Sequence, residues 1–105
     1  MLSKKDLFKT KEYWIEELQT EIYRQVVYYM AANDLSQNDL AEKWGVSKWY
    51  VSQLIKGKCN FSLKKLVELS LALEVVPIIE YVELDKYYEH KVEMNYLDEQ
   101  IRILN

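Results

Sequence analysis

Positive charge is concentrated between residues 43 and 67. This stretch holds six lysines and no acidic residue, a net charge of +6, whereas residues 1–42 carry −3 and residues 68–105 carry −6. A local concentration of charge attracts partners of opposite sign even when the whole chain is acidic, as this one is at −3. We therefore expect the stretch to bind a polyanion, with a solvated face that binds nothing as the alternative. The six residues are Lys43, Lys48, Lys56, Lys58, Lys64 and Lys65.

Hydroxyl, amide and aromatic side chains lie among these lysines. The sequence SKWYVSQLIK, from Ser47 to Lys56, places Trp49 and Tyr50 side by side and follows them with Ser52 and Gln53. Glutamine, lysine and serine side chains can hydrogen-bond to the edges of DNA bases. Apolar groups can contact the methyl group of thymine. This mixture is typical of a surface that binds nucleic acid.

Catalytic and metal-binding patterns are not expected. His90 is the only histidine and Cys59 the only cysteine, so the chain offers no metal-ligand cluster, and no glycine-rich phosphate loop lies near them. A lone cysteine also forms no intrachain disulfide. We expect a protein that is not an enzyme, needs no cofactor and works in a reducing cytoplasm. The polar start MLSKKDLFKTKE does not resemble a secretory signal, and no apolar run is long enough for a membrane span.

The basic stretch must be positioned by helices. The chain has 105 residues, of which 50% are apolar, but only two glycines and one proline. This composition predicts a single domain over residues 1–105 with long helices and short connections. Helices are predicted at 10–32, 36–44, 47–55 and 62–73 from apolar spacing, from the serines that cap the last three, and from Gly45, which ends the second.

The second and third predicted helices have the spacing of a helix-turn-helix. Two short helices that cross closely need a small residue at the contact, a residue that tolerates a positive φ at the turn, and apolar residues on the inner faces. Ala41 meets the first demand and Gly45 the second. The inner faces hold Leu40, Trp44, Val46, Val51 and Leu54. Seven matches at fixed positions favour a helix-turn-helix, with Trp44 in the core.

Residues 35–75 resemble the lambda-repressor/Cro-like (XRE) DNA-binding domains. The similarity lies in LSQNDLAEKWGVSKWYVSQLIKG and in FSLKKLVELSLALEV. It implies an all-α, lambda-repressor-like bundle of four to five helices, with a long N-terminal helix and a short C-terminal strand or helix extension. The helix-turn-helix core is expected at 11–74. The partner implied is double-stranded DNA, and the helix at 47–55 would read its major groove.

The resemblance also implies roles for individual residues. Gln37 would hydrogen-bond to the DNA backbone or to a neighbouring contact side chain. Lys48 would bind guanine or phosphate, and Gln53 would pair with adenine. Lys56 and Lys58 would bind phosphates. The exposed face of the reading helix would consist of Ser47, Lys48, Trp49, Ser52 and Gln53.

Two interpretations of the aromatic residues Trp49 and Tyr50 remain open. Val51 and Leu54 face the core, which turns Trp49 outward, toward thymine methyls or sugar, while Tyr50 would offer its hydroxyl to phosphate. The alternative is that both rings pack against the long first helix.

The C-terminal third, residues 75–105, is expected to make a homodimer. The fourth helix is apolar nearly all round, and the β-branched residues at 78–84 predict a short strand. A seam with heptad spacing follows from residue 87. It consists of Tyr87, His90, Met94, Leu97, Ile101 and Leu104. The alternative is that all three surfaces bury against the first helix of the same chain.

Two classes of function remain open. The first is a sequence-specific transcriptional regulator, either a small repressor or the antitoxin of a toxin–antitoxin pair that represses its own operon. The second is a protein-interaction module that kept the fold and lost DNA binding. The basic stretch favours the first, and a neighbouring gene for a small basic toxin would favour the antitoxin with its toxin partner.

Overall fold

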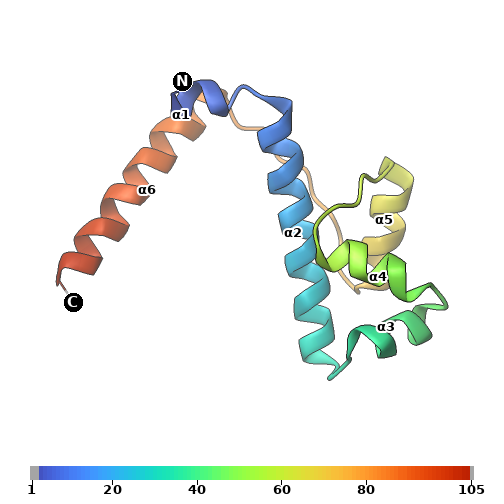
Figure 1. Cartoon of the computed structure of the whole chain (residues 1–105). Coiled ribbons are helices and arrows are strands. Elements are labelled where there is room, and N and C mark those ends of the chain that lie inside the picture. The colour runs from blue at the N-terminus through green and yellow to red at the C-terminus, as the bar shows by residue number, and fades with distance from the viewer. Residues whose placement is uncertain (1–2, 105) are drawn as a thin grey trace. The chain divides into compact units, whose positions relative to one another are not determined.

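The computed structural model describes the backbone of residues 3–104 and the side chains of residues 3–91, Met94, Leu97 and Gln100. Within residues 3–104 it contains six helices and no strand (Figure 1), which confirms the predicted all-α fold. The helices are α1 (Lys4–Leu7), α2 (Lys11–Ala32), α3 (Gln37–Trp44), α4 (Lys48–Ile55), α5 (Leu63–Ala72) and α6 (Leu84–Leu104).

The chain divides into two compact units. One comprises Trp14–Ile78, and the other comprises Met1–Tyr13 together with Ile79–Asn105. The first unit contains nearly all of the helix-turn-helix core expected at 11–74. The expectation of a single domain over residues 1–105 stays a prediction.

Local side-chain chemistry sets the ends of the short helices. Ser36 forms a capping box with Asp39 at the start of α3, and these hydrogen bonds hold the pKa of the Asp39 carboxyl below its usual range. Gly45 ends α3 at φ 66°, a left-handed conformation that glycine adopts without steric cost. Ser47 and Ser62 accept hydrogen bonds from backbone N–H groups at the starts of α4 and α5. The predicted caps are confirmed.

The core of the Trp14–Ile78 unit forms where α2 to α5 meet. Its buried side chains come from all four helices, and Leu40, Leu54, Val26 and Val51 are the largest that are fully buried. Trp44 stacks on Tyr29 with ring centroids 6.0 Å apart, which confirms its predicted place against the core. The rest of the core cluster consists of Tyr29, Ala41, Leu69 and Leu73.

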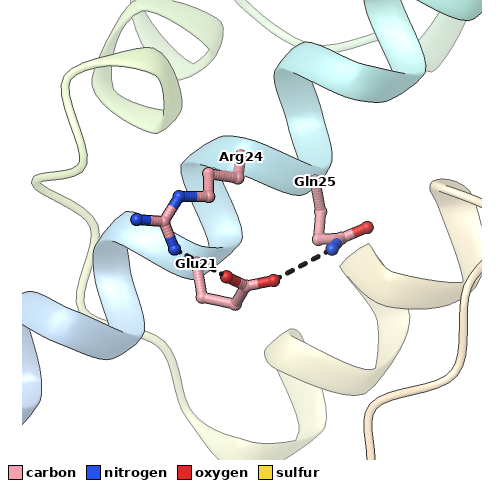
Figure 2. A network of polar contacts seen from close by, with 3 residues as sticks. All are labelled: Glu21, Arg24 and Gln25. Carbon is pink, nitrogen blue, oxygen red and sulfur yellow. Dashed lines mark hydrogen bonds and ion pairs between the residues drawn. The ribbon is translucent and has the colours of Figure 1, made fainter. Parts of the chain in front are cut away.

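Side-chain bonds also connect the long helix α2 to the rest of this unit and along its own surface. The Gln19 amide donates a 2.9 Å hydrogen bond to the backbone carbonyl of Cys59, in the segment between α4 and α5. Further along α2, Glu21 accepts hydrogen bonds from Arg24 at 3.1 Å and Gln25 at 3.0 Å (Figure 2). These bonds lower the pKa of Glu21, with Gln25 the larger cause. The Arg24 charge is thus engaged by a carboxylate on the same helix.

An aromatic cluster organises the described part of the second unit. Phe8, just after α1, is buried among three tyrosine rings, with centroids 5.0 Å away for Tyr13, 5.2 Å for Tyr87 and 6.1 Å for Tyr88. Lys5 bonds Asp85 at 2.9 Å, which raises the pKa of Lys5 and lowers that of Asp85. These contacts attach the first turns of α6 to α1.

The predicted heptad seam does lie on a helix, because α6 runs from Leu84 to Leu104. Its first member, Tyr87, packs on Phe8, whereas Met94 and Leu97 are exposed. The side chains of Ile101 and Leu104 lie outside the described residues.

The prediction of a strand at 78–84 is wrong. Residues 75–83 have no regular secondary structure, and Leu84 begins α6. Ile78 and Tyr81 are 87% and 92% exposed. β-Branched and aromatic residues favour a strand only where another strand lies beside them to complete the backbone hydrogen bonds. The described residues of this chain supply no such neighbour.

The left-handed turn at Gly45 leads to a test of stability. A Cβ at this position would meet no atom within 4 Å, so the cost of Gly45→Ala is conformational strain alone. We expect it to lower the free energy of unfolding by about 1–2 kcal/mol, and Gly45→Asn to cost less because asparagine tolerates a positive φ. Urea unfolding followed by circular dichroism measures both, with Glu42→Ala as an exposed control. Equal stability of the alanine variant and the parent protein would contradict this account.

Candidate nucleic-acid interface

The outward side of α4 and of its C-cap carries a set of polar, basic and aromatic residues, here called the reading face. At 3.6 residues per turn these residues share one side of the helix, opposite the buried Val51 and Leu54. Lys48, Trp49 and Lys56 are exposed, and Ser52 and Gln53 are partly exposed. No acidic residue occurs in the sequence between 43 and 67, so α4 itself carries no carboxylate. The reading face consists of Lys48, Trp49, Ser52, Gln53 and Lys56.

Two further predicted residues lie at the starts of α3 and α4. Gln37 is the exposed first residue of α3. Ser47 is exposed just before α4, where its Oγ accepts a 3.0 Å hydrogen bond from the backbone N–H of Tyr50. The Ser47 hydroxyl can still donate its own proton outward while it caps the helix.

The structure separates the two aromatic residues. The Trp49 side chain is 70% exposed, so the alternative that it packs against α2 does not hold. Tyr50 is partly buried against the core, and its burial raises the pKa of the phenol. The Lys65 ammonium lies 5.7 Å from the centroid of the Tyr50 ring. Trp49 therefore belongs to the outer surface, while Tyr50 joins that surface to the core.

A hollow of about 320 Å³ lies beside the reading face. Three aromatic residues and one cysteine line it, together with two lysines and two amides and no carboxylate. Burial raises the pKa of the Cys59 thiol, which favours the neutral thiol over the reactive thiolate. The hollow can thus take an apolar group that lies next to an anion. Its lining residues are Trp49, Tyr50, Gln53, Lys58, Cys59, Asn60, Phe61 and Lys65.

The six lysines of the basic stretch do not all gather at α4. Lys48 and Lys56 belong to the reading face, and Lys58 and Lys65 line the hollow. The Lys43 ammonium lies 5.2 Å from the centroid of the Tyr29 ring. A hydrogen bond with the Tyr29 side chain is the largest of the causes that raise the pKa of Lys43. The sixth, Lys64, is an exposed residue of α5.

Four residues of this surface were not assigned as contact residues from the sequence. Cys59, Asn60, Phe61 and Lys65 line the hollow together with Lys58 and predicted residues of α4. Lys65 could have been found, because it belongs to the basic stretch and is exposed on α5. The places of Asn60 and Phe61 depend on the path of the irregular segment between α4 and α5, which apolar spacing does not predict.

Comparison with family models identifies the class of protein. The helix-turn-helix family matches residues 28–81, just over half of the chain, and this span includes α3, α4 and α5. The chain belongs to this family, in its XRE-type, lambda-repressor-like branch of DNA-binding domains. Comparison with curated proteins and with solved structures finds no match. No helix in the described part of the chain is long and apolar enough to cross a membrane.

Trp49 offers a test that separates binding from folding. Since its side chain is mostly exposed, Trp49→Ala should change the free energy of unfolding by no more than about 0.5 kcal/mol. The role expected for Trp49 from the sequence, an apolar contact to the DNA, predicts that the same change weakens duplex DNA binding about tenfold. Tyr50→Ala is the contrasting variant and should lower the free energy of unfolding by about 1–2 kcal/mol, since Tyr50 is half-buried. Urea unfolding and fluorescence anisotropy on a labelled duplex measure the two effects. A large loss of stability in Trp49→Ala would contradict the assignment.

Proposed function

We propose that this protein is a sequence-specific double-stranded DNA-binding regulator, a small repressor that reads the major groove with the helix at 47–55. The observation that carries the proposal is the reading face of α4, which is exposed, basic and free of acids, on a helix anchored by Val51 and Leu54. An α-helix fits the major groove, where each base pair shows its own pattern of donors and acceptors.

Each residue of the interface has a proposed role. Gln53 reads an adenine through its amide, and Lys48 binds guanine or phosphate. Gln37, Ser47 and Ser52 supply hydrogen bonds to backbone or bases. The phosphate contacts come from Lys56, Lys58 and Lys65.

The aromatic residues and the hollow complete the proposed contact. Trp49 meets thymine methyls or deoxyribose, and Tyr50 directs its hydroxyl to a phosphate. The hollow receives a sugar of the strand whose phosphates bind Lys58 and Lys65, because its apolar walls adjoin both ammonium groups.

We further propose that the working unit is a homodimer. A single reading helix covers few base pairs, and proteins of this class double the site with half-sites about 34 Å apart. The support is exposed apolar surface at three places: three residues of α5, the segment from Ile78 to Val82, and Met94 with Leu97 on α6.

An antitoxin role is the second candidate. An antitoxin needs the same DNA-reading surface and, in addition, a segment that grips its toxin. Ile78, Ile79, Tyr81 and Val82 are exposed in an irregular segment, which a partner chain could bind through both side chains and backbone. Co-expression with the product of a neighbouring gene, followed by co-purification, tests this role.

The phosphate contacts predict a steep salt dependence. Each neutralised phosphate lowers the logarithm of the association constant by about 0.9 per logarithmic unit of salt concentration. If the four lysines at α4 and its hollow all bind phosphates, the slope for one protomer should lie between about −3 and −4. Anisotropy titrations on a selected duplex at several salt concentrations measure this slope. Absence of duplex binding at low salt, even with selected sequences, would favour the protein-interaction module instead.

Base reading and phosphate binding should respond differently to mutation. Gln53→Ala should relax the preference at one base step and cost about 1–3 kcal/mol on the best site. Lys56→Ala and Lys58→Ala should weaken all sequences about equally, and each should reduce the salt slope by about 0.9. Lys86→Ala, which removes an exposed charge paired with Glu83, is the control. Binding-site selection with each variant gives the preferences. An unchanged preference in Gln53→Ala would show that α4 is not the reading helix.

A further inference from the structure

An exposed apolar row runs along α5. Leu63, Val67 and Leu71 are 69%, 39% and 61% exposed, although leucine and valine favour burial. They are spaced four residues apart, so they lie in one row on the helix surface, here called the α5 row. The inner side of α5 is a separate surface, because Leu69, Ser70 and Leu73 fill the core. The α5 row is therefore apolar surface that the fold of its own unit does not use.

Charged residues border this row on one flank. Lys64 follows Leu63 and Glu68 follows Val67, and both are exposed. The opposite flank holds Leu66, which is partly buried, and Ser70, whose hydroxyl donates to the Leu66 carbonyl at 2.8 Å. Glu68 lies 4.0 Å from Lys65, a weak contact between exposed groups that leaves its carboxylate accessible.

This pattern is complementary to itself in one orientation only. In an antiparallel pair of α5 helices around a two-fold axis at Val67, Leu63 of each copy meets Leu71 of the other. The charged flanks then face each other, so that Lys64 of each copy lies opposite Glu68 of the other. A parallel pair would instead place the charged flank against the flank of Leu66 and Ser70. Two-fold symmetry repeats each favourable contact, as isologous interfaces require.

We propose that the α5 row is the centre of a two-fold interface with a second copy of this chain. The inference rests on the proposed DNA-binding function and deepens it, because it names the surface that pairs two reading helices. The occupant is a second copy because the row and its charges match their own antiparallel image.

The interface is small, and this sets its strength. Three apolar side chains on each helix bury far less than the roughly 1,200–2,000 Å² of a stable complex. The pair is therefore weak in free solution and strengthened when two copies bind adjacent half-sites, since the DNA raises their effective concentration. The expected behaviour is concentration-dependent self-association and cooperative binding to a two-fold symmetric site.

Disulfide trapping tests the geometry without DNA. In a Cys59→Ser background, Val67→Cys should crosslink to itself under mild oxidation, because the two-fold axis brings both copies of residue 67 together. Leu71→Cys alone should not crosslink, whereas a mixture of Leu63→Cys and Leu71→Cys should give the mixed dimer. The Cys59→Ser protein is the control for random oxidation. Equal crosslinking at positions 67 and 71 would overturn the two-fold register.

Charge exchange tests the same contact in free solution. Lys64→Glu and Glu68→Lys should each weaken self-association between about threefold and tenfold, because each places two like-charged pairs in the interface. The double variant should recover the parent association constant, which a merely structural effect would not do. Sedimentation equilibrium over a wide concentration range measures these constants. Ile78→Asp and Met94→Asp are matched controls on the other exposed apolar surfaces.

The outcomes separate this inference from the proposed function. Crosslinking and sedimentation are measured without DNA. Duplex binding of the reduced Val67→Cys protein is measured in a separate experiment. Trapping at position 67 without duplex binding would support the interface and reject the DNA-binding role. Duplex binding with no trapping and no response to charge exchange would overturn the interface. Loss of self-association only in Ile78→Asp or Met94→Asp would assign dimerisation to another surface and also overturn it.

Discussion

The attachment of α4 to the core is the constraint on which the rest of the structure depends. A helix of eight residues is too short to be stable in water by itself, so packing must hold it. Val51 and Leu54 supply that packing, and both are almost completely buried against residues of the other helices. Because two inward side chains fix the rotation of so short a helix, they also decide which residues face outward. The reading face is thus a consequence of the core.

The close packing of α3 on α4 is a second constraint on the position of α4. The two helices pack directly on each other, and Ala41 is buried at 3% exposure. The chain must then reverse within the few residues between α3 and α4, which it does through the left-handed Gly45 and the cap at Ser47. A bulkier residue at 41 would separate the helices and rotate α4 away from its packing. The spacing of small, flexible and apolar residues is therefore a physical requirement of the turn.

The helices and their caps could be predicted from the sequence because their causes are local. The bonds of Ser36, Ser47 and Ser62 each span three residues, and apolar spacing alone identifies the inner faces. The strand at 78–84 could not be judged in this way, since a strand depends on a distant neighbour. The hollow beside α4 was missed for a similar reason. It depends on how the segment after Gly57 returns along α4, with Gln19 of α2 bonded to the Cys59 carbonyl.

The basic stretch combines two surfaces that the net charge alone does not distinguish. Lys65 lies beside Tyr50 of α4, whereas Val67, at the centre of the α5 row, lies about 160° further round the helix at 3.6 residues per turn. A second copy that covers the row therefore approaches α5 from the side away from Lys65 and leaves the lysine side of α5 open. Lys64 lies between the two surfaces, next to the row, and Glu68 is the first acid after the basic stretch. The end of the basic stretch is thus where a surface suited to phosphates gives way to one suited to a copy of itself. A surface that bound phosphates would gain nothing from a carboxylate at 68, whereas a self-complementary pair needs one.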